Sequence, residues 1–131
     1  MKRIFKIGEL FSGPGGLGFA AKQAEVGNYK CKHVWAMDSD FDSCETYRAN
    51  ICKKNKTSVI NKSVVGFKFK KLKKIDALLF GFPCNDFSLV GEKKGLSGKY
   101  GGLYTAGIKC LKIFQPDWFL AENVSGIGFG Y

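Results

Sequence analysis

A cysteine directly behind a proline stands at the end of an apolar run, in the segment GFPCNDFS at residues 81–88. The run at residues 77–80 is typical of a buried strand, so Cys84 follows the point where that strand ends. An exposed thiolate is a nucleophile. Most cysteines, however, are small core residues, and residue type alone favours that role for Cys84. Its chemistry therefore depends on what the rest of the chain places beside it.

A second segment of chemical interest is FSGPGGLGFA, at residues 11–20, which follows the apolar run 4–10. Glycines let the backbone pass close to a ligand, and the free N–H groups at a helix start bind anionic groups. The G-K-[ST] ending of a P-loop is missing, so the segment is not a P-loop. The pattern predicts a strand, a glycine turn and a helix that approach a ligand.

An acidic cluster, MDSD, closes the apolar stretch at residues 32–37. Asp38 lies about twenty residues after the glycines, where a carboxylate can accept hydrogen bonds from both hydroxyls of a ribose. The alternative is a cap for the helix that begins at Phe41, which Ser39 or Asp40 can supply instead. A nucleoside-bearing cofactor is the working hypothesis.

Strand and helix patterns alternate along the chain and must position these segments. We expect strands at 4–10, 32–37, 76–80 and 117–123, a short strand near 59–60, and helices at 17–26, 41–50 and 103–114. Such alternation predicts an α/β fold with a mainly parallel sheet and right-handed crossovers, in which ligands bind beyond the carboxyl ends of the strands. The segments FSGPGG, MDSD, GFPCND and ENVSG would then gather along one edge of the sheet.

The apolar faces of the helices follow from the same periodicity. The first helix is expected to bury Leu17, Ala20, Ala21 and Ala24, the second Cys44, Tyr47 and Ile51, and the third Leu103, Gly107, Leu111 and Phe114. The lysine-rich stretch 68–74 is either a phosphate-binding patch or, more commonly, a solvated face. Its interleaved Phe67, Phe69 and Leu72 indicate an anchored amphipathic segment.

Length and composition limit the class of protein. The 131 residues, with no linker or internal repeat, predict a single domain, and the net charge of +10 favours a polyanionic partner, nucleic acid first. No apolar stretch is long enough to span a membrane. Five cysteines without a C-x-x-C pair and a single histidine favour neither a disulfide framework nor a metal site. We therefore expect a reduced, cytoplasmic protein without metal.

The segments FSGPGGLGFA, VWAMDSD, GFPCNDFS and LAENVSG, in this order, resemble the motifs of the cytosine-C5 DNA methyltransferases. The ordered set spans nearly the whole chain and is specific. The resemblance implies an S-adenosylmethionine-dependent methyltransferase (Rossmann-like) α/β fold, with a mainly parallel sheet flanked by helices and truncated before the last strands. It also implies transfer of a methyl group from S-adenosylmethionine to C5 of a cytosine flipped out of DNA, within a restriction-modification system.

The resemblance assigns roles to individual residues. Cys84 is the nucleophile that adds to C6 of cytosine, Glu122 is the acid at the N3 edge of the base, Pro83 stiffens the turn that aims the thiol, and Asn123 fixes the loop. The cofactor-binding residues are Phe11, Ser12, Gly13, Gly15, Gly16, Leu17, Asp38 and Leu103. Residues 85–100 match a loop that closes over the base, with Ser88, Lys93, Lys94 and Lys99 as DNA-binding residues.

The sequence departs from the family in three places. Asn85 follows the cysteine where glutamine is usual, and VINKSV stands where the family often places an aspartate near the adenine ring. The chain also ends after ENVSGIGFGY, so residues 1–131 are expected to be a partial catalytic domain without the target-recognition region. We therefore expect a second polypeptide to carry the missing motifs, or the chain to be a fragment.

Two other functions remain open at this point. One is an inactive remnant or subunit that binds S-adenosylmethionine or nucleic acid without turnover, because the catalytic residues remain while the later motifs are missing. The other is a transfer-RNA cytosine-C5 methyltransferase, because that branch shares the same motif types.

Overall fold

The structure is a computed structural model that describes residues 1–83 and 101–123. Within these residues, six strands form one sheet in the order β2-β3-β1-β5-β6, and β4 also pairs with β3. All of these pairs are parallel except that of β2 with β3. The strands are β1 (Arg3–Leu10), β2 (Glu25–Val26), β3 (Tyr29–Asp38), β4 (Val59–Asn61), β5 (Ala77–Gly81) and β6 (Trp118–Glu122). The predicted α/β fold with a mainly parallel sheet is confirmed.

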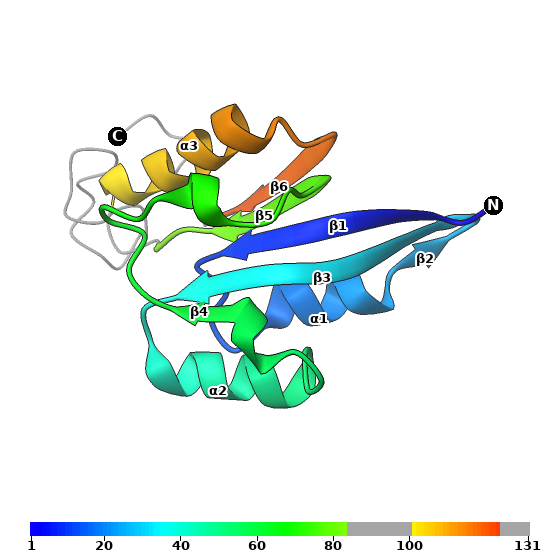
Figure 1. Cartoon of the computed structure of the whole chain (residues 1–131), viewed down its shortest axis with the longest axis horizontal. Helices are drawn as coiled ribbons and strands as arrows, with labels where there is room; N and C mark the ends of the chain where they lie inside the picture. The colour runs from blue at the N-terminus through cyan, green and yellow to red at the C-terminus, as the bar shows by residue number, and fades with distance from the viewer. Residues whose placement is uncertain (84–100, 124–131) are drawn as a thin grey trace.

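Helices cover both faces of this sheet (Figure 1). The helices α1 (Gly16–Gln23) and α2 (Phe41–Asn50) lie on one face, and α3 (Tyr104–Phe114) lies on the other. Three short 3-10 turns, η1 (Lys56–Ser58), η2 (Phe69–Lys71) and η4 (Gly101–Leu103), complete the described elements. The two faces have separate cores, because successive side chains of a strand point to opposite sides.

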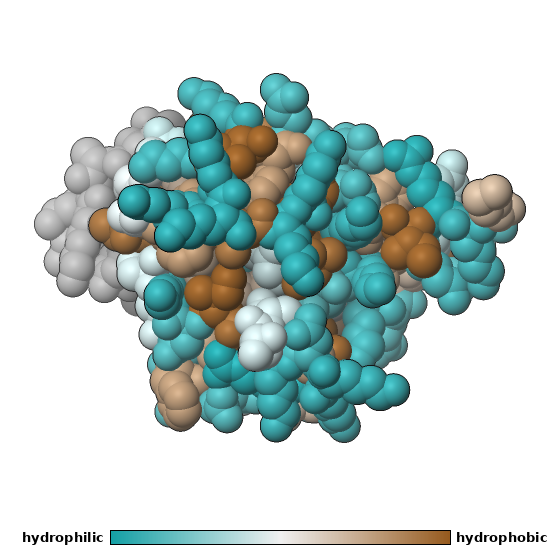
Figure 2. All heavy atoms as spheres, viewed as in Figure 1, coloured by the Kyte–Doolittle hydropathy of each residue, from teal (hydrophilic) through white to brown (hydrophobic). Residues whose placement is uncertain are grey.

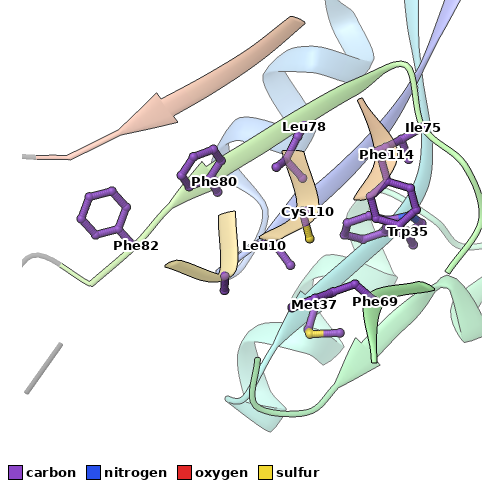
Figure 3. Packing of buried hydrophobic residues seen from close by; sticks show 11 residues of the cluster. Leu10, Trp35, Met37, Phe69, Ile75, Leu78, Phe80, Phe82, Cys110 and Phe114 are labelled. Carbon is purple, nitrogen blue, oxygen red and sulfur yellow. The ribbon is translucent and has the colours of Figure 1, made fainter. Parts of the chain in front are cut away.

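The larger core lies between the sheet and α3 (Figure 3). Leu10, Leu78 and Phe80 point to this side from the central strands, and Cys110 and Phe114 meet them from α3. Gly107 lets the helix approach closely, because a Cβ atom there would lie 2.5–2.8 Å from the ring of Phe80. On the opposite side, a small cluster formed by Ile7, Ala77 and Leu79 packs against α1. A third cluster joins α2 to β3 and β4.

The first helix is shorter than predicted, and its buried face is different. The chain leaves α1 after Gln23, and Ala20 and Ala24 are exposed. Residues 25–26 instead form β2, which turns through Gly27 and Asn28 to pair antiparallel with β3. Gly27 has φ +56°, a conformation that a tight hairpin requires and glycine adopts readily. The expectation of helix at residues 24–26 was therefore wrong, because the Gly-Asn turn signal competes with the helix-forming alanines.

The other helix faces were predicted more closely. Cys44, Tyr47 and Ile51 of the second helical segment are all buried, as expected. In α3 the buried residues are Ala106, Gly107, Cys110 and Phe114, so Gly107 and Phe114 of the predicted stripe are confirmed. Leu103 and Leu111, by contrast, are only half-buried.

The lysine-rich stretch 68–74 is anchored as expected. Phe69 is buried in the larger core, and Phe67 and Leu72 pack against that core.

Figure 2 shows hydrophilic side chains over much of the face that it presents, with hydrophobic side chains scattered among them. Among the described helices, none is long and apolar enough to cross a membrane. Residues 1–83 and 101–123 also contain no group of three or more His, Cys, Asp or Glu side chains arranged to hold a metal ion.

Candidate active site

The carboxyl ends of four strands meet at one edge of the sheet. Leu10, the last residue of β1, is paired with Met37 on one side and with Phe80 on the other. Gly81 is in turn paired with Glu122 at the end of β6. The predicted segments that begin at residues 11, 37, 81 and 122 therefore lie at the same edge of the sheet.

The glycine turn after β1 has an unusual backbone. Phe11 has φ +53°, a left-handed value that is uncommon for a residue other than glycine and is often found at functional sites. Gly13 and Gly15 also have positive φ, at +52° and +106°. The turn is fixed to the sheet because the N–H of Ser12 donates to the carbonyl of Met37 at 3.1 Å. Ser12 itself is buried.

Asp38 joins this turn to the start of α2. Its Oδ2 accepts a hydrogen bond from the N–H of Gly13 at 2.8 Å, and its Oδ1 accepts one from the N–H of Asp40 at 2.9 Å. Asp40 caps α2, since its side chain accepts a hydrogen bond from the N–H of Ser43 at 2.8 Å. Hydrogen bonds from Ser43 also lower the pKa of Asp40. Asp38 is therefore free of the capping role and lies beside the glycine turn.

The glycines of the turn serve two different purposes. A Cβ atom on Gly13 or Gly16 would meet no other atom within 4 Å, so these two positions face open space. A Cβ atom on Gly15 would collide with the side chains of Ile51 and Tyr47. Gly15 is therefore required by the packing of the turn against α2, a requirement that its place in the motif did not reveal.

A buried carboxyl group lies directly under the turn. Glu9 is 2% exposed, and its Oε2 lies 2.7 Å from the hydroxyl oxygen of Tyr47. Burial raises the pKa of Glu9 to about 7, although its contacts with Tyr47 and with the backbone N–H of Gly18 act in the opposite direction. Sequence reasoning missed this group. The available signal was a glutamate near the end of a strand, directly before the apolar residues Leu10 and Phe11.

The second half of the site is formed by the ends of β5 and β6. A Cβ atom on Gly81 would lie 3.0 Å from Oε2 of Glu122, so the carboxylate lies over a position without a side chain. The amide nitrogen of Asn123 donates to the carbonyl of Phe82 at 3.0 Å, which ties the two strand ends together. Pro83, half-buried, is the next residue after this link. Glu122 is exposed in the described part of the chain.

The remaining predicted site residues have varied positions. Leu17 packs against the cluster formed by Ile7, Ala77 and Leu79, so its described contacts are with the core. Leu103 ends η4 and lines a small hollow of about 140 Å³ together with Val64 and Ala106. Five predicted residues lie outside the described residues, namely Cys84, Ser88, Lys93, Lys94 and Lys99.

Solved structures with the same arrangement define the class of protein. A DNA modification methyltransferase encoded within a prophage of E. coli matches 93% of this chain and 32% of its own, with a TM-score of 0.68 and 27% identity. The Dnmt2 methyltransferase of S. pombe matches 95% of this chain and 36% of its own, with a TM-score of 0.63 and 20% identity. The fold is that of the S-adenosylmethionine-dependent methyltransferases.

Sequence comparison then identifies the family. The family described as C-5 cytosine-specific DNA methylase matches residues 5–128, so the chain belongs to this family. It is 47% identical to the type II methyltransferase M.BbvI of Brevibacillus brevis, over 94% of this chain. It is 36% identical to the type II methyltransferase M.NgoFVII of Neisseria gonorrhoeae, over 93% of this chain. The aligned regions are 36% and 31% of those two relatives, so the chain spans about a third of their length.

Proposed function

We propose that this chain is the cofactor-binding and catalytic part of a DNA cytosine-C5 methyltransferase of a type II restriction-modification system. The observation that carries the proposal is the meeting of the glycine turn with Pro83 and Glu122 at one edge of the sheet. The similarity to type II methyltransferases favours DNA over transfer RNA as the substrate. Such an enzyme works in the cytoplasm, and that compartment is part of the proposal.

The residues around the glycine turn fit S-adenosylmethionine. Gly13 and Gly16 leave space for close approach of a ligand, and the amide groups at the start of α1 suit its carboxylate. Asp38, next to Gly13, is suited to the ribose hydroxyls. When bound, this cofactor supplies an electrophilic methyl group on a sulfonium centre. The residues proposed to hold it are Phe11, Ser12, Gly13, Gly15, Gly16, Leu17, Asp38 and Leu103.

The chain's own catalytic groups would act on the cytosine ring. C5 of cytosine is a poor nucleophile until the thiolate of Cys84 adds to C6, which consumes the C5–C6 double bond and makes C5 electron-rich. Glu122 supplies a proton or hydrogen bond at N3, where negative charge builds up. After C5 has been substituted, loss of its proton and expulsion of the thiolate restore the double bond. Glu122 ends β6, and Cys84 comes three residues after the end of the neighbouring strand β5, which supports the proposal that both groups act on one base.

Two neighbouring residues would position the catalytic groups Cys84 and Glu122. Pro83 has no backbone N–H and a fixed φ, which stiffens the turn before Cys84. Asn123 holds the end of β6 to the carbonyl of Phe82, so that Glu122 and Pro83 keep a fixed separation. Ser88, Lys93, Lys94 and Lys99 are proposed to contact DNA phosphates.

Target recognition and the remaining motifs are proposed to be carried by a second polypeptide, or by a longer chain of which these residues are a fragment. β6 ends the described sheet, and its Phe119 and Leu120 are 55% and 43% exposed. Large apolar side chains on an edge strand suit a covering partner. The alternative function is an inactive remnant that binds S-adenosylmethionine or nucleic acid without turnover, and an experiment separates the two.

The test is a methyl-transfer assay with labelled S-adenosylmethionine and DNA. The chain is assayed alone and together with the carboxyl-terminal two thirds of its similar relative from Brevibacillus brevis. Labelled 5-methylcytosine in the mixture, lost when Cys84→Ser is used, supports the proposal. Cofactor binding without any labelled cytosine under complementation supports the inactive remnant instead, and methylation of transfer RNA in place of DNA overturns the choice of substrate.

A further inference from the structure

A chain of hydrogen bonds runs from Glu9 of β1, under the glycine turn, to η1. The carboxyl of Glu9 meets the hydroxyl of Tyr47 at 2.7 Å, and that hydroxyl lies 3.2 Å from Nδ1 of His33. Nε2 of His33 lies 2.6 Å from Oγ of Ser58, which donates to the carbonyl of Asn55 at 2.6 Å. Four contacts thus connect five groups from four separate parts of the chain.

The number of protons that these hydrogen bonds need determines the net charge of the hydrogen-bond chain. Ser58 has one hydroxyl proton, which goes to the carbonyl of Asn55, so Nε2 of His33 must donate to Ser58. Two further protons are then needed for the contacts between His33 and Tyr47 and between Tyr47 and Glu9. Tyr47 supplies one, and the other is carried by Glu9 or by Nδ1 of His33. All four hydrogen bonds therefore form only when Glu9 or Nδ1 of His33 carries one proton, in addition to the proton on Nε2 of His33. We call this the shared proton of Glu9 and His33.

The surroundings favour the proton on Glu9. Burial raises the pKa of Glu9 to about 7 and lowers that of His33, so below about pH 7 the shared proton is on Glu9 and His33 is neutral. The charged or titratable groups that face the chain are Asp38 of β3, Lys22 of α1, and Cys52, which lies just beyond α2. Within the sheet, Glu9 is flanked by Ala36 and Leu79. Loss of the shared proton would leave three protons for four contacts and an uncompensated charge in the core.

The hydrogen-bond chain contacts the proposed cofactor site. Gly18, in the first turn of α1, contacts both the carboxyl of Glu9 and the hydroxyl of Tyr47, and a Cβ atom there would lie 2.5 Å from Oε2 of Glu9. The ring of Tyr47 also supports Gly15, where a Cβ atom would lie 2.9 Å from Cδ2 of that ring. A change in the position of Tyr47 would therefore alter the packing of the glycine turn directly.

We propose that Glu9 and Tyr47 are positioning residues whose protonated hydrogen-bond chain holds the glycine turn in its cofactor-binding conformation and releases it when the shared proton is lost. This inference rests on the proposed function, because the turn is assumed to bind S-adenosylmethionine. Glu9→Gln is the informative variant, since glutamine donates to Tyr47 without a proton that can be lost. Glu25→Gln, which changes an exposed glutamate of β2, is the matched control.

The experiment measures two quantities between pH 6 and pH 8.5. The first, without cofactor, is the amide chemical shifts of Gly13, Gly15 and Gly18 in the 131-residue chain. We expect these shifts to titrate near pH 7 in the wild type and in Glu25→Gln, and to be flat in Glu9→Gln. The second is the affinity for S-adenosylmethionine by calorimetry, which should fall roughly tenfold over this range in the wild type, about the effect of one hydrogen bond, and not in Glu9→Gln.

The two readouts separate the possible failures. Amide shifts that do not titrate, or that titrate equally in Glu9→Gln, overturn the positioning role. Shifts that titrate as expected in a chain that binds no S-adenosylmethionine at any pH contradict the proposed function and leave the hydrogen-bond chain supported. Tyr47→Phe, which keeps the ring and removes the hydroxyl, should move the titration to higher pH, because the contact with Tyr47 lowers the pKa of Glu9. If that variant does not fold, Glu9→Gln carries the test alone.

Discussion

The carboxylate of Glu122 lies over the backbone of Gly81, its register partner in the neighbouring strand. The Cα hydrogen of Gly81 occupies the place where any other residue would carry a Cβ atom, 3.0 Å from Oε2 of Glu122. Pro83 follows Gly81 by two residues, and the proposed nucleophile Cys84 is next in the sequence. The same pair of strand ends therefore positions the proposed acid and Pro83.

Gly81→Ala should therefore impair catalysis more than folding. The new methyl group displaces the carboxylate of Glu122 by a few tenths of an ångström or more, while alanine is well tolerated in the extended conformation of a strand. We expect methyl transfer by the complemented enzyme to fall about tenfold or more, as is typical when a catalytic group is misplaced. The midpoint of urea unfolding should change little.

A double-mutant cycle tests whether this effect acts through Glu122. In a Glu122→Gln background, Gly81→Ala should have almost no additional effect on the rate. Additive losses in the two variants would show that Gly81 acts elsewhere.

Asp38→Asn should weaken cofactor binding. An asparagine has a single acceptor oxygen, so it cannot accept from both Gly13 and Asp40, and its NH₂ group would face one of these two donors. We expect at least a tenfold loss of affinity for S-adenosylmethionine by calorimetry and a loss of about 1–2 kcal/mol in the free energy of unfolding. Asp40→Asn is the control, because asparagine is an equally good helix cap. Equal affinities in Asp38→Asn and the wild type would exclude Asp38 from the cofactor site.

The stability of the chain should depend on pH through two opposing groups. The pKa of Glu9 is raised in the folded state from 4.5 to about 7, so the unfolded chain loses this proton first as pH rises. Glu9 therefore reduces the free energy of unfolding as pH rises from 4.5 to 7, by about 3 kcal/mol in total. The pKa of His33 is lowered from 6.5 to about 4, so the unfolded chain binds this proton first as pH falls, and stability is lost as pH falls from 6.5 to 4.

Single variants separate these contributions in urea unfolding curves recorded from pH 4 to 8. Glu9→Gln should remove the falling component and leave a stability that rises with pH up to about 6.5. His33→Gln should remove the rising component and leave a stability that falls between pH 4.5 and 7. Two variants with the same pH dependence as the wild type would contradict these assignments.

Gly107→Ala should destabilise the fold although alanine is the better helix former. The added methyl group would lie 2.5–2.8 Å from ring atoms of Phe80, so α3 must move away from β5. Overpacking of this kind typically costs about 1–3 kcal/mol in urea unfolding experiments. Lys109→Ala, at an exposed position of the same helix, should change the free energy of unfolding by less than about 0.5 kcal/mol. A Gly107→Ala variant as stable as the wild type would mean that the helix shifts freely.

The local pattern of the sequence was sufficient for most of the fold. Apolar runs located β1, β5 and β6. Of these, β5 is buried on both faces, and a continuous apolar run is the usual signature of such a strand. The start of α2 was also clear, since Asp40 is a strong helix cap. The end of α1 was not, because the Gly27–Asn28 turn and three alanines give conflicting local signals, and pairing with β3 decides between them.

The candidate site was predictable only where one residue carries its own signal. Asp38 and Gly13 belong to separate motifs, yet their hydrogen bond required the register of β1 with β3. The chain from Glu9 to Ser58 was missed for the same reason: Tyr47 and His33 look like ordinary core residues until the fold brings them together. Gly15 was interpreted as a ligand-facing residue, but its need for glycine also comes from Tyr47 and Ile51.

Covalent trapping tests the central chemistry most directly. DNA containing 5-fluorocytosine stops the reaction at the adduct, because fluorine cannot leave C5 as a proton does. In the complemented enzyme with S-adenosylmethionine, peptide mass spectrometry should find the base on Cys84, and Cys84→Ser should give no adduct while its cofactor affinity stays within about twofold of the wild type. The thiols of Cys44 and Cys110 are buried, and burial raises the pKa of Cys110 to about 12, which makes them poor nucleophiles. An adduct on either of them, or none in an assembly that methylates ordinary cytosine, would contradict the account.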